Sequence, residues 1–291
     1  METTNNITQI IIDTINKIFE TLFSSIDNNL YFLLDDITFI STDILNDKNF
    51  ENIFGTSTSN GLLLISNALL LGFIIYYSIK YLMAHLTYSP IESPISFIIK
   101  LVLCGICMNF SFYILYFVLD LNSNISLSIR SLGEYLFNKE ICFSELINTI
   151  NTNMSIDTSS IDIFSIDGIL KGSLSISLLN LIFSYSFRYI MVKIFILLSP
   201  FAFLSLTTNS TSWFFKTWAR NLFSLLFIQD IVSLILLILF SINYSSNLFT
   251  KFIYVGGSYS LIKANSFVRE FVGGISTDFS QNVQSFSKIK N

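Results

Sequence analysis

The chain of 291 residues is 52% hydrophobic and 12% charged, and its formal net charge is −4. Soluble domains carry about 25% charged residues. A chain with half that share of charges, together with 30 Phe and 13 Tyr, is not an ordinary soluble globular protein. The composition instead indicates a chain that buries apolar surface in a lipid bilayer.

Apolar stretches long enough to cross a bilayer follow one another from residue 61 onward. About 20 apolar residues span the hydrocarbon layer, and backbone groups inside it must be bonded within the segment, which favours helices. We therefore predict an all-α fold, a polytopic helical membrane protein with about five transmembrane helices. The stretches are Gly61–Ile79, Leu101–Leu119, Gly172–Phe187, Ile194–Phe215 and Asn221–Asn247, the last with one charge, Asp230.

Composition divides the chain into five units. Residues 1–60 form an acidic amphipathic arm, and residues 61–119 hold the first two spans around a short basic loop. Residues 120–171 form an acidic loop, and residues 172–247 hold the C-terminal spans. The basic tail, 248–291, contains an amphipathic helix over residues 258–272, which Gly256-Gly257 and Gly273-Gly274 are expected to delimit.

The distribution of charge predicts the orientation of the chain. Lys and Arg collect in short cytoplasmic loops. The loop 80–100 and the tail 251–291 are rich in bases relative to acids, whereas residues 1–60 and 120–171 are acidic. We expect the N-terminal arm outside and the C-terminal tail inside a bacterial cytoplasmic membrane, which requires an odd number of spans.

Two cations, Arg188 and Lys193, interrupt the apolar stretch 187–206 and leave two interpretations open. In the first, residues 188–193 form a tight cytoplasmic turn and Ile194–Thr207 returns as a separate, short span. In the second, one long helix ends at Ser199-Pro200 and is followed by a re-entrant or interfacial segment. Arg188 would then face the bundle interior with Asp230 as its partner, because a charge within a membrane span is expensive unless it is paired.

Several other residues stand out. Trp213, Lys216, Trp218 and Arg220 read as an interfacial anchor before the last span, since Trp prefers the headgroup layer. Gln229 and Asp230 follow early in that span, where an acid suggests a helix contact or an ion path. Ala68 and Gly72, four residues apart in the first span, fit close helix packing.

The sequence predicts no catalytic set, no metal site and no cofactor. His85 is the only histidine, and the Cys104-x-x-Cys107 pair lies in an uncharged span without residues that would stabilise a thiolate. Cys142 is a single thiol in the acidic loop, so no disulfide framework is expected. We therefore expect a protein that is not an enzyme.

Residues 170–275 resemble a known family. The stretch that begins RYIMVKIFILLSPFAFLSL at Arg188 continues through Trp218, and the closing segment is FIYVGGSYSLIKANSFVREFVGG. Together they are similar to the TrbL-like polytopic membrane subunit of conjugative type IV secretion systems, the sixth component in the VirB naming. The residues that carry the resemblance are Arg188, the Ser199-Pro200-Phe201-Ala202-Phe203 stretch, Trp218 and the amphipathic end.

The resemblance implies a channel or scaffold subunit of a DNA-transfer apparatus. Such a subunit would form homo-oligomers in the membrane and contact other secretion-channel proteins and ATPases. Arg188, Lys193, Lys216 and Arg220 could then contact the transferred DNA–protein substrate through its phosphates. The alternatives are a small-solute transporter and a holin-like or immunity membrane protein.

Overall fold

The computed structural model describes residues 28–55, 61–153, 166–242 and 248–275, with positions 10, 14 and 17 in addition. Every regular element in these residues is a helix. Four helices are long and apolar enough to cross a membrane, so the chain is a helical polytopic membrane protein. The elements are α2 (Asn28–Thr38), η1 (Thr42–Leu45), α3 (Lys48–Phe54), α4 (Leu62–Thr87), α5 (Pro94–Asn109), α6 (Ser111–Phe137), α7 (Phe143–Asn153), α8 (Ile166–Leu197), α9 (Ser199–Leu204), η2 (Ser205–Thr207), α10 (Ser212–Ser241) and α11 (Leu248–Val272).

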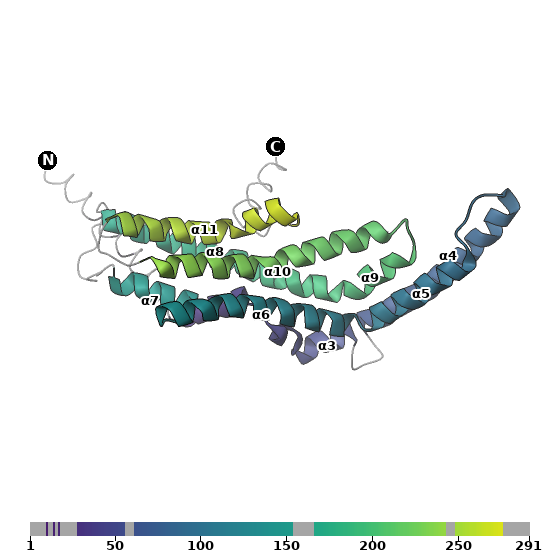
Figure 1. Ribbon diagram of the computed structural model, residues 1–291, viewed down its shortest axis with the longest axis horizontal. Coiled ribbons are helices and arrows are strands. Elements are labelled where there is room, and N and C mark those ends of the chain that lie inside the picture. The colour runs from purple at the N-terminus through teal and green to yellow at the C-terminus, as the bar shows by residue number, and fades with distance from the viewer. Residues whose placement is uncertain are drawn as a thin grey trace.

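Helices α6, α8, α10 and α11 lie along the long axis of the molecule, and α4 and α5 form a hairpin that projects from one end (Figure 1). Helix α10 is central, because it packs against α6, α8 and α11. The side chain of Asn122 donates to the carbonyl of Leu226, and the hydroxyls of Ser126 and Ser233 lie 2.8 Å apart. Residue numbers increase in the same direction in both helices, from Asn122 to Ser126 in α6 and from Leu226 to Ser233 in α10, so the two helices run parallel.

Helix α11 runs antiparallel to α10. A Cβ placed on Gly257 would lie 2.3 Å from Leu239 Cδ2, and one placed on Gly273 would lie 3.2 Å from Arg220 Cδ. The end of α11 therefore lies beside the first turns of α10. The chain leaves α11 through Gly273 and Gly274, whose φ angles of +79° and +148° belong to glycine.

The structure decides between the two interpretations of residues 188–193. Both cations lie inside α8, which continues without a break to Leu197, so the tight turn is wrong and the long helix is confirmed. The helix gives way at Ser199-Pro200, where Pro200 occupies the first turn of α9. The expected separate span Ile194–Thr207 is instead divided among α8, α9 and η2.

Two other expected boundaries differ. The second predicted span is broken at Phe110, where α5 ends and α6 begins, and α6 continues into the expected acidic loop as far as Phe137. It stays helical because Leu119, Ser126 and Gly133 recur on one buried face. Residues 154–165 of that loop lie outside the described residues.

Gly256 and Gly257 do not delimit the C-terminal helix as expected. They lie inside α11, which begins at Leu248. At Gly257 the missing side chain lets α11 approach Leu239 of α10, so this glycine serves packing between helices.

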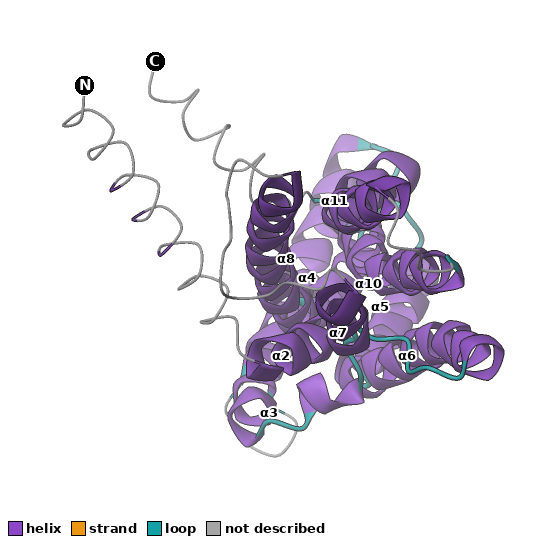
Figure 2. Ribbon diagram, turned by 90° about the vertical axis from the view of Figure 1, so that its left-hand side faces the viewer, coloured by secondary structure: helices purple, strands orange, loops and turns teal. Residues whose placement is uncertain are grey.

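The described part of the acidic arm, residues 28–55, packs on the bundle. Viewed along the long axis, α2 lies beside α7 and α8, and α3 lies next to α2 at the edge of the bundle (Figure 2), while η1 contacts α6. Leu34, Ile40, Leu45 and Phe54 are each at most 2% exposed. This segment therefore contributes side chains to the core of the molecule, while most of the arm before it lies outside the described residues.

Candidate functional site

Arg188 is the centre of a buried polar site between α2, α8 and α10. Its side chain is 0% exposed. The Nε group donates to the carbonyl of Leu225 at 2.6 Å, Nη1 donates to the carbonyl of Thr38 at 2.8 Å, and Nη2 lies 3.4 Å from Oε1 of Gln229. The guanidinium thus uses three of its nitrogens on acceptors of the same chain, two of which are backbone carbonyls.

The site supplies hydrogen-bond partners to backbone groups at the end of α2. Thr38 ends α2, and residues 39–41 are not helical before η1 begins. The last carbonyls of a helix lack partners within it and carry partial negative charge, which favours a cation there. Gln229 completes the arrangement, since its Oε1 accepts from the backbone N–H of Ile40 at 3.0 Å. We call Arg188 and Gln229 the clamp.

Asp230 does not pair directly with Arg188. No ion pair within 4.0 Å joins the two residues, although the carboxylate is close enough to act on the guanidinium electrostatically. Successive residues on a helix are turned by about 100°, so Asp230 does not share the side of α10 on which Gln229 meets Arg188. Its side chain is 4% exposed, and Oδ1 has no hydrogen-bond partner among the described residues.

Lys193 also contacts the N-terminal segment. Its Nζ lies 3.9 Å from a carboxylate oxygen of Asp47, and it sits 5.6 Å and 5.3 Å from the ring centres of Phe50 and Tyr189. The two cations of the apolar stretch therefore hold residues 38–50 against α8. Neither cation marks the end of a helix.

The predicted interfacial anchor separates into buried and exposed residues. Trp218 is 5% exposed, donates from Nε1 to the carbonyl of Phe195 at 2.8 Å and is part of the core. Trp213 is 64% exposed, and Lys216 and Arg220 are also exposed. Only these three of the four residues are free to meet a headgroup layer.

The small residues of the first span do not form a contact within the described residues. Ala68 and Gly72 are exposed, and a Cβ placed on Gly72 would find nothing within 4 Å. The two helices of the hairpin meet through Asn67 and Asn109 instead, whose side-chain amides exchange bonds of 3.1 and 3.2 Å.

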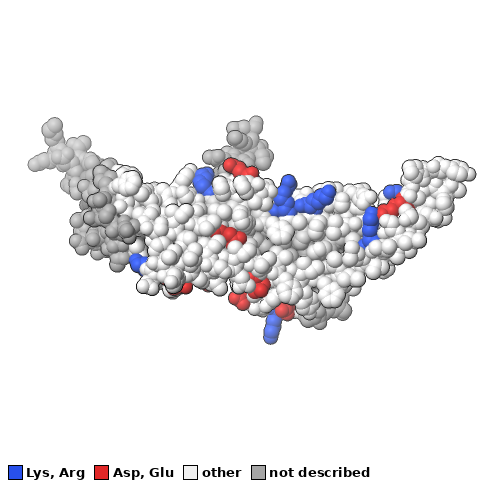
Figure 3. Space-filling model, in the orientation of Figure 1, with Lys and Arg blue, Asp and Glu red and all other residues white. Residues whose placement is uncertain are grey.

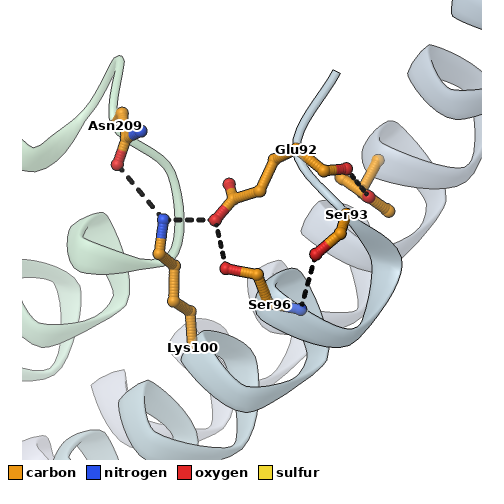
Figure 4. A network of polar contacts seen from close by, with 6 residues as sticks. Glu92, Ser93, Ser96, Lys100 and Asn209 are labelled. Carbon is orange, nitrogen blue, oxygen red and sulfur yellow. Dashed lines mark hydrogen bonds and ion pairs between the residues drawn. The ribbon is translucent and has the colours of Figure 1, made fainter. Parts of the chain in front are cut away.

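A second polar network fastens the hairpin to the bundle (Figure 4). Lys100 of α5 lies 2.5 Å from Glu92 Oε1 and 3.4 Å from Asn209 Oδ1 in the loop before α10, and Ser96 donates to the same Glu92 oxygen. These contacts hold the pKa of Glu92 below its usual value. This link could not be predicted from the sequence, because Asn209 is more than 100 residues from Lys100.

Asp35 is a further residue of interest that no pattern in the sequence indicates. Its carboxylate accepts from the backbone N–H groups of Phe143 and Ser144 at 2.7 and 3.2 Å, and from the Ser144 hydroxyl at 2.7 Å. These are the first residues of α7, so α2 caps α7 from a distance. Burial raises the pKa of Asp35, although the three hydrogen bonds act against the shift.

The thiols sit in surroundings that do not activate them. Cys142 is 5% exposed, and burial raises its pKa to about 11. Cys104 is buried in α5 and Cys107 is half-buried. Across the described part of the chain, no three His, Cys, Asp or Glu side chains come together in a way that could hold a metal ion.

Compared with known proteins, the chain matches no family model, no curated protein and no solved structure. Its likeness to the TrbL-like subunits therefore rests on the sequence features alone.

Proposed function

We propose that the chain is a non-enzymatic scaffold or channel subunit of a conjugative type IV secretion apparatus in a bacterial cytoplasmic membrane. In this role it forms homo-oligomers, contacts other channel proteins and secretion ATPases, and helps DNA–protein substrate to cross the membrane. The observation that carries the proposal is that Arg188 is buried and hydrogen-bonded to backbone carbonyls of two other helices. Its hydrogen bonds fasten the N-terminal segment into the bundle, as expected of a residue that maintains a framework.

The exposed apolar surface also supports a subunit that works among neighbours. On the projecting hairpin, Leu82, Leu86 and Ile95 are 64%, 77% and 73% exposed. Lipid covers part of such a surface, and neighbouring subunits of an assembly would cover the rest. The proposal assigns no substrate contact to Arg188, since a side chain that is 0% exposed has no surface to offer. Of Arg188, Lys193, Lys216 and Arg220, only the last two are exposed.

The proposal is tested by removing the gene from the bacterium that carries it and measuring conjugal transfer of a marked element. We expect transfer to fall to background and to return when the wild-type chain is supplied. The Arg188→Leu variant should fail to restore transfer, because it loses the clamp. A Gly256→Ala variant is the matched control, since the site has open space on α11.

Transfer at the normal frequency without the gene would overturn the proposal. A small-solute transporter predicts a different result: normal transfer, together with solute flux into liposomes that contain the purified chain. A holin-like or immunity protein predicts normal transfer and altered cell lysis or survival.

A further inference from the structure

One face of α10 stays exposed along nearly the whole helix. Residues three, four or seven apart share a helix face. At its start this face carries Trp213, Lys216 and Arg220, and after these it is apolar. The apolar residues are Phe223, Phe227, Leu234 and Ile238, which are 54%, 38%, 42% and 62% exposed.

Lys216 and Arg220 are two neighbouring cations on this face. Lys216 and Arg220 lie one turn apart, and neither takes part in an ion pair within the described residues. Helix α11 ends beside them: the stem of Arg220 packs at Gly273, one turn after Arg269. Lys and Arg side chains gather over the part of the surface where α10 begins and α11 ends, with an acid nearby (Figure 3); Glu270 is exposed in this last turn.

The apolar part has the length of a membrane core. Arg220 and Ile238 are 18 residues apart on α10, which corresponds to about 27 Å at a rise of about 1.5 Å per residue. The hydrocarbon layer of a bilayer is about 30 Å thick. The face thus offers two cations and an exposed indole at one end, followed by an apolar strip.

We propose that this face binds a phospholipid with an anionic headgroup. Lys216 and Arg220 contact the headgroup phosphate, Trp213 lies in the headgroup layer, and the acyl chains run along Phe223 and Phe227. Basic residues next to a membrane span attract anionic lipid, and Trp prefers the layer between water and hydrocarbon. A nucleic acid would use the two cations but would leave Phe223 and Phe227 uncovered, whereas a phospholipid accounts for the cations and for the apolar residues that follow them.

The test uses the full-length chain, purified in detergent and stripped of lipid, with phosphatidylglycerol and phosphatidylcholine of identical acyl chains as probes. Bound lipid is counted by native mass spectrometry. We expect phosphatidylglycerol to bind at least about tenfold more tightly than phosphatidylcholine, and a K216Q/R220Q variant to lose that preference, since each basic residue near an anionic surface contributes about a fivefold factor. A K48Q/K139Q variant removes the same charge elsewhere and should keep the preference.

Equal binding of the two lipids by the wild-type chain would overturn the proposal. So would a preference that survives in K216Q/R220Q. If single-stranded oligonucleotide displaced the anionic lipid and bound with the same dependence on Lys216 and Arg220, the face would be assigned to nucleic acid instead. The readout is independent of DNA transfer, so it stands or falls separately from the proposed function.

Discussion

At Arg188 a guanidinium is enclosed by protein, and its hydrogen-bond geometry accounts for its stability there. A buried charge is costly unless it is hydrogen-bonded. The planar fork meets the carbonyl that ends α2, a carbonyl of α10 and the amide of Gln229 in one arrangement. Lys carries its three donors on a single nitrogen, so it cannot reach the same set of separated acceptors. The arginine side chain thus bonds the N-terminal segment at the point where α2 ends, before the non-helical residues 39–41.

We expect Arg188→Leu to lower the free energy of unfolding by about 3 kcal/mol or more, because the acceptors left behind are buried. Arg188→Lys should fall between Leu and wild type. The measurement is thermal unfolding of the purified chain in detergent. Gln229→Leu, combined with Arg188→Leu, should lose less stability than the two single changes added together, because both act on the end of α2. An Arg188→Leu variant as stable as wild type would show that the clamp does not hold the segment.

At the scale of elements, contacts between helices are made where side chains are small or where one helix caps another. Gly256 and Gly257 are adjacent in α11 and differ in their surroundings. A Cβ on Gly256 meets nothing within 4 Å, whereas a Cβ on Gly257 lies within 3.1 Å of three side-chain atoms of Leu239. Leu239 is 3% exposed, so it has little room to move.

Alanine at these two glycines should therefore have opposite effects. Gly256→Ala should raise the free energy of unfolding by about 0.5–1 kcal/mol, because alanine favours a helix interior over glycine. Gly257→Ala should lower it by about 1–3 kcal/mol, the usual cost of an overpacked contact. Unfolding of both variants in the same detergent gives the comparison. Equal effects would mean that α11 does not approach α10 at Gly257.

The joint between α2 and α7 is expected to depend on pH. Burial raises the pKa of Asp35 in the folded chain above its ordinary value of 3.8. A raised pKa in the folded state gives stability that is fully present below the ordinary pKa and is lost as the pH rises through the folded value. The stability of wild type relative to Asp35→Asn should therefore decrease as the pH is raised from about 4 to about 7.

Unfolding midpoints of the two proteins across this range test the prediction, and hydrogen exchange of the α7 amides shows where the effect lies. The nearby cation Arg130 acts in the opposite direction by lowering the pKa of Asp35. A difference between the proteins that stays constant or grows with pH would mean that the hydrogen bonds from α7 outweigh burial.

For the whole molecule, apolar runs predicted the helices well and their contacts poorly. Apolar stretches identified α4 and most of α10, because length and hydropathy suffice to predict a span. They did not show that α8 continues through Arg188 and Lys193. The partners that make those cations acceptable lie far away in the chain, and Arg188 and Thr38 are 150 residues apart. Periodicity describes one helix at a time and carries no information on which acceptor from another segment will meet its face.

The directions of the helices suggest a revised path through the membrane. The candidate spans α4, α6, α8 and α10 follow one another, and α11 then runs back along α10 to end beside Arg220. Helix α5 returns along α4, because Asn109 at its end meets Asn67 near the start of α4, so the hairpin brings the chain back to the level at which it began. If α6, α8, α10 and α11 cross, the start of α10 and the end of α11 lie on the same side of the membrane. We expect this side to be the inside, because Lys216 and Arg220 lie there and Lys100 contacts Asn209 just before α10, as the positive-inside rule requires. The predicted outside N-terminus stays a prediction.

Single cysteines in a chain with Cys104, Cys107 and Cys142 replaced test this path by labelling in intact cells. Cysteines at Ser89, Ser210 and Ser285 should be protected from a reagent that cannot cross the membrane, and one at Ser159 should be labelled. Ser210 is decisive, because a tight turn at residues 188–193 would place it outside with Ser159. Protection of Ser210 with labelling of Ser285 would mean that α11 packs on the bundle without crossing. Labelling of Ser210 would contradict a continuous α8 that crosses the membrane. The contacts of Arg188 with Thr38 and Gln229 would then not exist in the membrane-inserted protein.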